Sequence, residues 1–275
     1  MNYPRAKKRF GQHFLIDDNI LRKMVTAAEL DPHTGVIEIG AGRGALTDHL
    51  LNEAGGILAY EIDRNLGSLL KPRFEAENMT LIVDDVLKAD IKDDLLRHLS
   101  DFERIVAVGN LPYNITTPIM MRFLEENIPV ERMIFMMQKE VAERIAGRPR
   151  TKDYNALSVL VDYRAEVTKL FNVSRHVFRP KPRVDSAVVR LDVRTTPKVK
   201  VKDETFFIEM VRAAFRQRRK TCVNNLTAHF TSMEKSDISI LMEDMGYSPK
   251  IRSEALSTED FAVIANRFYE DINHA

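Results

Sequence analysis

Residues 36–45 read Val-Ile-Glu-Ile-Gly-Ala-Gly-Arg-Gly-Ala, a short apolar run that leads into a turn with three glycines. The apolar run predicts a buried strand, and the segment 45–53 after the turn predicts a helix. Glycines at such a turn let the backbone approach a ligand at the carboxyl end of a sheet, where open α/β folds bind ligands. The turn therefore predicts an α/β fold with a ligand site at the end of this strand.

Strand-like and helix-like segments continue to alternate around this turn. A capped helix is expected before it, over 17–30, and two segments near the middle of the chain, 157–164 and 185–193, read as an antiparallel pair of strands at the sheet edge. The other expected strands are 57–61, 80–83, 104–108 and 132–136, separated by expected helices at 64–77, 116–127 and 139–146. Strands separated by helices predict a parallel sheet that is covered on both faces.

The last quarter of the chain has a different pattern. Residues 195–202 read as a linker, and the segments beyond them, 203–229, 236–245 and 257–272, are helical only. We therefore expect two domains, a Rossmann-like α/β domain over residues 1–198 and a small all-α domain over residues 199–275.

The composition narrows the class of protein. The chain has 275 residues, of which 44% are hydrophobic and 29% charged, as in ordinary globular proteins with a sizeable core. Its one cysteine excludes an intrachain disulfide, and no cysteine pair suggests zinc. No apolar stretch approaches the ~18–20 residues that a membrane span needs, and the basic N-terminus lacks the apolar core of a secretory signal. We expect a cytoplasmic protein, without metal or membrane association, and a monomer.

The net charge of +1 conceals two basic segments. Residues 1–23 carry six Lys or Arg against two Asp or Glu, and residues 175–220 carry 14 against 5. If folding brings the two segments onto one face, that face would attract a polyanion such as nucleic acid. Alternatively, the two segments form separate solvated basic surfaces that do not bind one ligand together.

Carboxylates near the glycine turn favour one cofactor over another. Glu61 ends the second expected strand, where a carboxylate can accept both ribose hydroxyls of a nucleotide-like cofactor. Glu38, beside Gly40 and Gly42, fits a cationic ligand better than a pyrophosphate, which it would repel. S-adenosylmethionine is cationic and lacks phosphate, so it is preferred to NAD. Asp85, after the third strand, could accept from the adenine amine of the cofactor, or it could cap a helix.

The turn after the fourth strand, residues 110–113, reads Asn-Leu-Pro-Tyr. The amine of adenine is a poor nucleophile, and two acceptors near its hydrogens would help to localise the lone pair and aim it at a methyl group. The side-chain oxygen of Asn110 can be one acceptor and the carbonyl of Leu111 the other, because Pro112 holds the preceding residue extended. Tyr113 offers a ring on which a base can stack. An ordinary turn at a strand end is the alternative.

With these residues the chain resembles the bacterial small-subunit ribosomal RNA adenine dimethyltransferase family over nearly its whole length. The resemblance rests on seven motifs and on Asp85. The motifs are Phe-Gly-Gln-His-Phe-Leu from Phe10, Glu-Ile-Gly-Ala-Gly from Glu38, Glu-Ile-Asp from Glu61, Asn-Leu-Pro-Tyr-Asn-Ile from Asn110, Gln-Lys-Glu-Val from Gln138, Phe-Arg-Pro-Lys-Pro-Arg-Val-Asp-Ser from Phe178 and Phe-Arg-Gln-Arg-Arg-Lys-Thr from Phe215. It implies an enzyme that uses S-adenosylmethionine to dimethylate two adjacent adenines near the 3′ end of 16S ribosomal RNA in the small subunit or its assembly precursor, with a role in ribosome biogenesis.

The resemblance also implies site residues. It assigns cofactor contacts to His13, Leu15, Gly40, Glu61, Asp85 and Asn110, to which the residue-based reading adds Glu38 and Gly42. It implies that Asn110 and Leu111 orient the target amine and that Tyr113 and Phe178 sandwich the adenine. The family usually has Asn where this chain has His13, so this contact follows less directly from the resemblance.

Basic side chains are candidates for the RNA contacts. Phe178 lies in a basic loop stiffened by two prolines, which suits a stacking platform for an unpaired base; a core Phe beside a solvated loop is the alternative. The predicted RNA-binding residues are Arg179, Lys181 and Arg183 in this loop and Arg216, Arg218, Arg219 and Lys220 on an expected helix, where the alternative is surface charge paired with acidic residues of 221–275.

Three other functions compete with this interpretation. An enzyme of the same fold that methylates large-subunit RNA and confers macrolide resistance shares the glycine turn and a very similar Asn-Leu-Pro-Tyr turn, but the segment 217–221 and the form of the Phe178 loop favour the small-subunit enzyme. A non-catalytic ribosome-assembly or transcription factor is disfavoured by the intact turn at 110–113. An NAD-dependent oxidoreductase is disfavoured because no convincing acid/base pair for hydride transfer is present.

Overall fold

The computed structural model describes residue 4, residues 6–75 and residues 77–274, and its chain divides into two compact units. The first unit contains the chain up to Ala142 together with Glu166–Val193, and the second contains Glu143–Ala165 together with Arg194–Ala275. Each unit is therefore built from two separate segments of the chain. The second unit includes residues 143–165, whereas the domain boundary expected at residue 198 assigns them to the first domain. The expected division into domains 1–198 and 199–275 stays a prediction.

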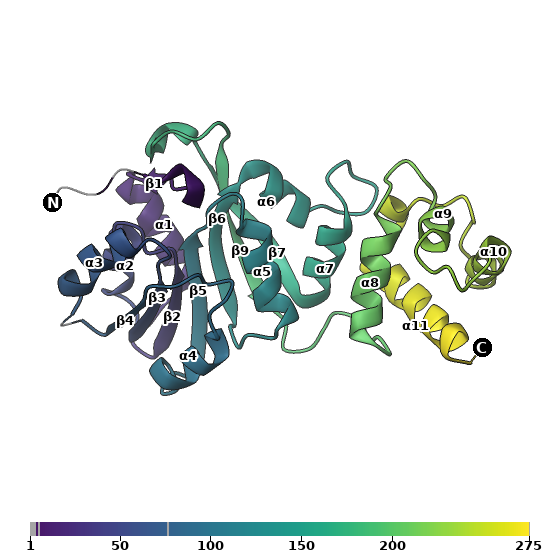
Figure 1. Cartoon of the computed structure of the whole chain (residues 1–275), viewed down its shortest axis with the longest axis horizontal. Coiled ribbons are helices and arrows are strands. Elements are labelled where there is room, and N and C mark those ends of the chain that lie inside the picture. Colours follow the sequence, from purple (N-terminus) through teal and green to yellow (C-terminus); the bar gives the residue numbers. More distant parts are fainter. Residues whose placement is uncertain (1–3, 5, 76, 275) are drawn as a thin grey trace. The chain divides into compact units, whose positions relative to one another are not determined.

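A seven-stranded sheet organises the first unit (Figure 1), with the strand order β4-β3-β2-β5-β6-β9-β7. The four pairings from β4 to β6 are parallel, and β9 runs antiparallel to β6. The strands are β2 (Thr34–Ile39), β3 (Gly56–Tyr60), β4 (Met79–Ile82), β5 (Arg104–Asn110), β6 (Arg132–Gln138), β7 (Ala165–Val173) and β9 (Ser186–Val193). This confirms the predicted Rossmann-like parallel sheet. The strand order turns at β2 and β5, and ligands of open α/β sheets bind at such a point.

Helices cover both faces of this sheet, as expected of a parallel sheet. They are α1 (Asp18–Ala28), α2 (Ala45–Leu50), α3 (Arg64–Arg73), α4 (Ile91–His98), α5 (Thr116–Glu125) and α6 (Lys139–Ile145). The first begins where Asp17 accepts hydrogen bonds from two backbone N–H groups of its first turn. A short antiparallel pair, β1 (Phe14–Leu15) and β8 (Phe178–Arg179), joins the N-terminal segment to a loop more than 160 residues later in the chain.

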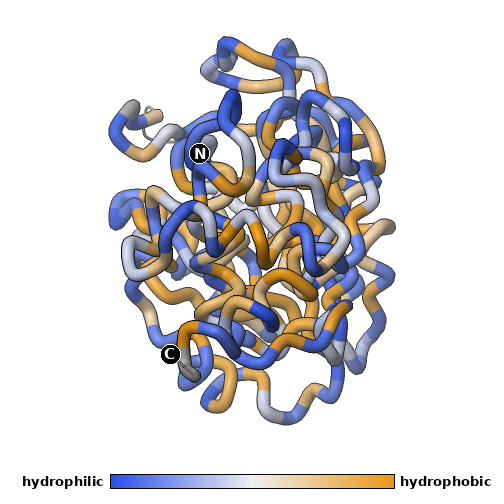
Figure 2. The backbone as a smooth tube through the Cα atoms, turned by 90° about the vertical axis from the view of Figure 1, so that its right-hand side faces the viewer, coloured by the Kyte–Doolittle hydropathy of each residue, from blue (hydrophilic) through white to orange (hydrophobic). Residues whose placement is uncertain are grey.

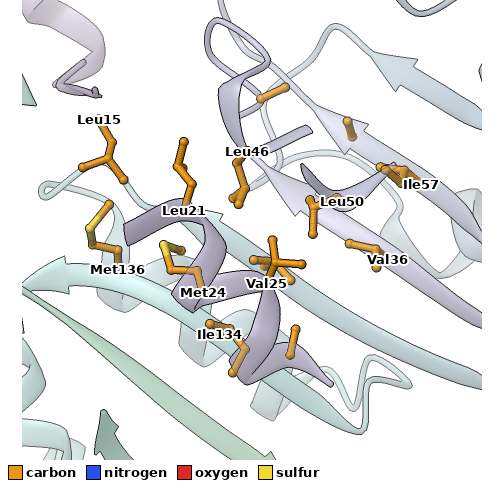
Figure 3. Close-up of a cluster of buried hydrophobic side chains, with 14 of the residues drawn as sticks. Leu15, Leu21, Met24, Val25, Val36, Leu46, Leu50, Ile57, Ile134 and Met136 are labelled. Atoms are coloured by element: carbon orange, nitrogen blue, oxygen red, sulfur yellow. The ribbon is translucent and has the colours of Figure 1, made fainter. Parts of the chain in front are cut away.

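The core on one face of the sheet lies under α1 and α2. Figure 3 shows Met24 and Val25 of α1 and Leu50 of α2 near side chains of the strands, among them Ile134 and Met136 of β6. Because side chains alternate along a strand, Phe135 points to the other face, where its ring meets that of Phe123 from α5 edge to face at 6.3 Å. The two faces therefore have separate helical covers, and the strands between them are buried.

One expected strand is a helix. Residues 157–164 belong to α7 (Ala156–Arg164), and the strand follows directly as β7. Asn155 accepts from the N–H of Leu157, and the hydroxyl of Ser158 accepts from the N–H of Asn155, so the helix begins with a capping box. The run Val159–Val161 is buried throughout and shows no alternation that would separate a helix from a strand. The strand that pairs with β9 at the sheet edge is therefore β7, the element that follows the expected segment.

The second unit contains α7 and the helices α8 (Glu204–Ala214), α9 (Cys222–Thr227), α10 (Lys235–Asp244) and α11 (Thr258–His274). Its aromatic core includes Tyr163 and Phe207, whose ring centroids are 4.7 Å apart. Figure 2 shows hydrophobic and hydrophilic residues alternating along much of the tube, as expected of elements with one covered side. No helix in the described part of the chain is long and apolar enough to cross a membrane.

The single helix expected over 203–229 is two helices with a turn between them. Thr221 caps the second helix through the N–H of Asn224. Asn225 donates to the carbonyl of Ala214, the last residue of the first helix, and to that of Gln217 beyond it. Residues 216–220 therefore form an exposed loop and not a helical surface.

We predict that Met24→Ala lowers the free energy of unfolding by about 2–5 kcal/mol, because Met24 is fully buried against the sheet and its loss leaves a cavity. Urea unfolding followed by circular dichroism measures this change. Asn19→Ala, an exposed position of the same helix, is the control and should change stability by less than about 0.5 kcal/mol. Equal midpoints for the two variants would contradict the packing of α1.

Candidate functional site

A pocket lies at the carboxyl end of the parallel strands. Its wall comes from the N-terminal segment and from the loops that follow four strands: Phe10–Phe14, Gly40 and Gly42 after β2, Glu61 and Ile62 after β3, Asp84–Val86 after β4, and Asn110–Tyr113 after β5. The sheet therefore brings together most of the residues that the sequence predicts for the site, although they are spread over about a hundred positions of the chain.

The glycine turn adopts backbone conformations that other residues rarely take. Gly40 and Gly42 have φ angles of 77° and 61°. The N–H of Gly40 donates to the carbonyl of Tyr60 at 2.8 Å, so the turn is tied to the neighbouring strand. A side chain at Gly40 would enter open space and not the protein, which leaves room for a ligand beside the backbone.

Glu61 is the acid most firmly held at the pocket. One carboxylate oxygen accepts from the N–H of Gly42 at 2.7 Å and the other from the N–H of Asp63 at 2.8 Å. Burial raises the pKa of Glu61, and the two backbone donors oppose this shift by favouring the ionised form. Each oxygen keeps a further lone pair, so the carboxylate can still accept hydrogen bonds from a ligand hydroxyl.

Glu38, for which the sequence predicts a cofactor contact, does not line the pocket. Its side chain is fully buried between β2 and α2, where one oxygen accepts from the hydroxyl of Thr47 at 2.7 Å and the other has no partner. Burial raises the pKa of Glu38 to about 7. The alternation along β2 explains the difference, because Ile39 reaches the pocket and its neighbour Glu38 points to the opposite side of the strand.

Asp85 lies at the pocket and also makes a local hydrogen bond of the kind that a capping residue makes. It lines the pocket, and its carboxylate also accepts from the N–H of Leu87 at 3.1 Å, which begins the turn after β4. The side chain is therefore fixed at the pocket by a local hydrogen bond and remains available to a ligand, because a carboxylate has about four acceptor sites.

The corner at residues 110–113 faces the same pocket. The amide nitrogen of Asn110 donates to the carbonyl of His13 at 3.0 Å. Because a carbonyl oxygen can only accept, this bond fixes which end of the amide is the nitrogen, and Oδ1 is left as the acceptor. The N–H of Leu111 donates to Met136 of β6 at 3.0 Å, and the carbonyl of Pro112 accepts from Ile115 at 3.1 Å. Backbone bonds on both sides therefore hold the corner.

Tyr113 is half-buried and keeps part of its ring at the pocket. Its hydroxyl hydrogen-bonds the hydroxyl of Ser186 at 2.7 Å, and burial raises its pKa. Its ring lies against that of His13, with the centroids 5.5 Å apart and the planes inclined by 27°. The predicted stacking residue is thus present, with a second ring already beside it.

Phe178 and Leu15 are core residues here. Phe178 has no exposed surface and Leu15 is 7% exposed; both belong to the hydrophobic cluster under α1, and neither lines the pocket. They lie opposite each other in the β1–β8 pair, where each contributes its side chain to the core. Neither side chain therefore lines the pocket in this structure, and the sandwich of Tyr113 and Phe178 and the cofactor contact of Leu15 stay predictions.

The predicted RNA-binding residues divide between the two units. Arg179 is exposed at the end of β8, and Lys181 and Arg183 are exposed on the loop after it. Arg179 also donates to the carbonyls of His176 and Phe178. Arg216, Arg218, Arg219 and Lys220 are exposed on the loop between α8 and α9, where Arg218 pairs with Glu254 at 3.2 Å and binds the carbonyl of Lys152. The acidic pairing considered from sequence thus applies to Arg218.

The sequence interpretation missed how the N-terminal segment is fastened to the pocket. Asp63, which is 1% exposed, accepts from the ammonium of Lys7 at 2.6 Å and from the amide of Gln12 at 3.2 Å. Gln12 in turn accepts from the N–H of Lys7 at 2.8 Å. Asp63 lies two residues after Glu61, so its place at a strand end was visible in the sequence, but its partners were not. Among the described residues, no group of three or more His, Cys, Asp or Glu could hold a metal ion.

Comparison with known proteins gives consistent matches over nearly the whole chain. The family model described as "Ribosomal RNA adenine dimethylase" matches residues 4–268. A protein of Bacillus mycoides (strain KBAB4), named ribosomal RNA small subunit methyltransferase A, is 45% identical over 263 residues, or 94% of this chain and 90% of that protein. A protein of the same name from Bacillus cereus (strain AH187) is also 45% identical over 263 residues, with the same coverage of both chains.

Solved structures agree with the fold. A dimethyladenosine transferase from Plasmodium falciparum superposes with a TM-score of 0.77 and 25% identity, covering 95% of this chain and 98% of that one. The 23S rRNA methyltransferase ErmE gives a TM-score of 0.68 at 25% identity, covering 92% and 98%. The two similarities include both the sheet and the helices that follow it.

We predict that Glu38→Gln changes how stability depends on pH. Burial raises the pKa of Glu38 to about 7, so the native state holds its proton up to about that pH, whereas the ordinary pKa of an exposed glutamate is 4.5. The acid therefore contributes its full stability below about pH 4.5, and this contribution is lost as the pH rises through 7, at a cost of about 3 kcal/mol. Glutamine cannot ionise and should avoid this loss.

Urea unfolding at several pH values between about 4 and 8 measures the effect. As the pH rises, the free energy of unfolding of the variant should increase by about 2–3 kcal/mol relative to that of the wild type. This shift is expected whichever of the two proteins is more stable at low pH. The exposed Glu53→Gln is the control. Parallel curves for Glu38→Gln and wild type would show that Glu38 does not titrate as its burial requires.

Proposed function

The chain belongs to the ribosomal RNA adenine dimethylase family, and on that premise we propose that it transfers methyl groups from S-adenosylmethionine to the N6 amine of two adjacent adenines near the 3′ end of 16S ribosomal RNA. The observation that carries the proposal is the Asn110 corner, whose acceptor oxygen is oriented at the same pocket as the glycine turn and Glu61. The substrate would be the small ribosomal subunit or its assembly precursor, which the protein would meet in the cytoplasm as a monomer.

The residues of the pocket fit S-adenosylmethionine better than a cofactor with a pyrophosphate. Acidic groups dominate its polar wall: Glu61, Asp84 and Asp85 line it, and no Lys or Arg does so in the described chain. A cationic ligand is favoured in such a pocket, whereas a phosphate would be repelled. Glu61 would hold the ribose hydroxyls, Asp85 the adenine amine, and the turn at Gly40 and Gly42 the backbone side of the cofactor.

The corner would act on the adenine by orientation and not by deprotonation. Bound S-adenosylmethionine supplies an electrophilic methyl group. Oδ1 of Asn110 and the carbonyl of Leu111 would accept the two amine hydrogens, which localises the nitrogen lone pair and directs it towards the cofactor side of the pocket. Pro112 holds Leu111 in an extended conformation, and Tyr113 offers its ring to the base once the base has left its stack.

The basic loops supply the contacts expected with RNA. We infer that Arg179, Lys181 and Arg183 in the first unit, and Arg216, Arg219 and Lys220 in the second, bind phosphates, with Arg218 contributing less because it is paired with Glu254. Phosphate contacts position an RNA without reading its sequence. Choice of the target adenines would then depend on the base site and on the shape of the particle.

A large-subunit RNA methyltransferase is the nearest alternative, since ErmE shares the fold. Primer extension on both RNAs after reaction distinguishes the two functions, and modification confined to the large-subunit RNA would overturn the proposal. A role in small-subunit assembly without methylation is the second alternative; it would leave the nucleosides of the treated subunits unmodified.

We predict that Asn110→Ala lowers the rate of methyl transfer roughly 100- to 1,000-fold, because one of two preorganised acceptors is removed. Unmethylated small subunits are incubated with labelled S-adenosylmethionine, and the nucleosides are then analysed for N6,N6-dimethyladenosine. Binding to the subunits should remain, since Asn110 does not contact phosphates in this account. Asn52→Ala, exposed and distant from the pocket wall, is the matched control. Near-normal turnover by Asn110→Ala would contradict the orienting role.

We also predict that RNA affinity weakens steeply with salt and that Arg219→Ala reduces the slope of log K against log salt by roughly 0.7–0.9, the value for one phosphate contact. Filter binding over a range of salt concentrations measures the slope. Lys235→Ala, an exposed basic residue at the start of α10, serves as control and should leave it unchanged. A flat salt response of the wild type would remove the basis for these contacts.

A further inference from the structure

A hydrogen bond between two hydroxyls joins the Asn110 corner to the start of β9. The hydroxyl of Tyr113 lies 2.7 Å from that of Ser186, and Ser186 has no exposed surface. Ser186 is the first residue of β9 and the last of the sequence motif that begins at Phe178. A buried hydroxyl requires a hydrogen-bond partner, because it has lost its contact with water. Tyr113 supplies this partner, and the proposed chemistry gives Ser186 no part so far.

The sheet fixes where the hydroxyl of Ser186 lies. Asn110, which ends β5, pairs with Met136 of β6. Ser186, which begins β9, pairs with Gln138 at the end of β6. Because β9 runs antiparallel to β6, its first residue lies at the edge where β5 and β6 end. The ladder therefore brings Ser186 next to the turn that carries Tyr113, which lies 73 positions earlier in the chain.

The ring of Tyr113 needs a restraint beyond the backbone of its turn. The N–H of Leu111 and the carbonyl of Pro112 are held by backbone hydrogen bonds, which orient the main chain before Tyr113. These bonds do not set the two side-chain torsions of Tyr113, and its half-buried ring lies at the pocket. The hydroxyl is the atom of this side chain farthest from the backbone, so a hydrogen bond there restrains both torsions. A ring that is already ordered loses less entropy when a base binds to it.

We propose that Ser186 is a positioning residue of the base site, whose hydroxyl holds the ring of Tyr113 at the angle at which the target adenine stacks on it. The inference rests on the proposed function, in which Tyr113 offers its ring to the base, and adds a residue that acts through Tyr113 without touching the substrate. Burial raises the pKa of the Tyr113 hydroxyl, so this group stays protonated and the bond persists at neutral pH. Alternatively, Ser186 only completes the buried start of β9, and its bond has no effect on the reaction.

Two variants remove the bond from opposite ends. Ser186→Ala removes the restraint, and Tyr113→Phe keeps the ring but removes its attachment. We expect each variant to lower kcat for unmethylated small subunits roughly 3- to 10-fold, the range for one hydrogen bond between uncharged groups. KM for the subunits should change less than about twofold, because phosphate contacts supply most of the binding. The double variant should lose no more than either single variant, because all three lack the same bond.

Calorimetric titration with S-adenosylmethionine counts the folded sites of each variant, so that kcat is compared per site. Ser68→Ala is the control, because this exposed hydroxyl of α3 bonds the carbonyl of Arg64 at 2.9 Å, away from the pocket wall. Losses that multiply in the double variant, or a loss that disappears when kcat is counted per site, would overturn the inference. Tyr113→Phe leaves β9 unchanged, so a wild-type kcat in this variant alone overturns it too. A wild-type protein that methylates no adenine in small subunits overturns the proposed function instead.

Discussion

Parallel strands place their carboxyl ends at one edge of a sheet, and the candidate groups that follow β2 to β5 depend on that constraint. The loops after β2, β3, β4 and β5 contribute the glycine turn, Glu61, Asp85 and the Asn110 corner to a single pocket. None of these loops could form the site alone, because each brings one type of group. The ladder between the strands sets the spacing of the loops, so the packing of α1 and α2 against the sheet supports the pocket from a distance.

A second set of hydrogen bonds closes the pocket from the N-terminal side. Asp63 holds Lys7 and Gln12, and Asn110 holds the backbone of His13, so the segment before β1 is fastened at both ends. The bond from Asn110 has two effects: it secures this segment, and it turns the amide so that its oxygen is free to accept. The same side chain thus connects the closure of the pocket with the chemistry proposed inside it.

Much of the fold and most of the site could be predicted from the sequence. The alternation of short apolar runs and helical segments predicted the parallel sheet, and polar residues at strand ends predicted Gly40, Gly42, Glu61, Asp85 and the Asn110 corner, all of which line the pocket. Three differences between the expectations and the structure have physical causes. Glu38 is one residue from the end of β2, and only the alternation along that strand shows that it points away from the pocket. Phe178 and Leu15 meet across a strand pair formed by distant segments, which no local pattern reveals. The run 159–161 is apolar and shows no period, and only the cap at Asn155 identifies the helix.

The second unit is built from two separate chain segments, and this affects where the protein can be truncated. Tyr154 and Tyr163 lie before the last strand of the sheet, yet their partners, the carbonyl of Leu256 and the ring of Phe207, lie after it. Truncation after residue 198 would strip these aromatic side chains of their cover while leaving them in the polypeptide, where exposed apolar surface promotes aggregation. The segments of the two units therefore alternate along the chain, and a minimal fragment of the first unit would have to remove or replace residues 143–165 as well.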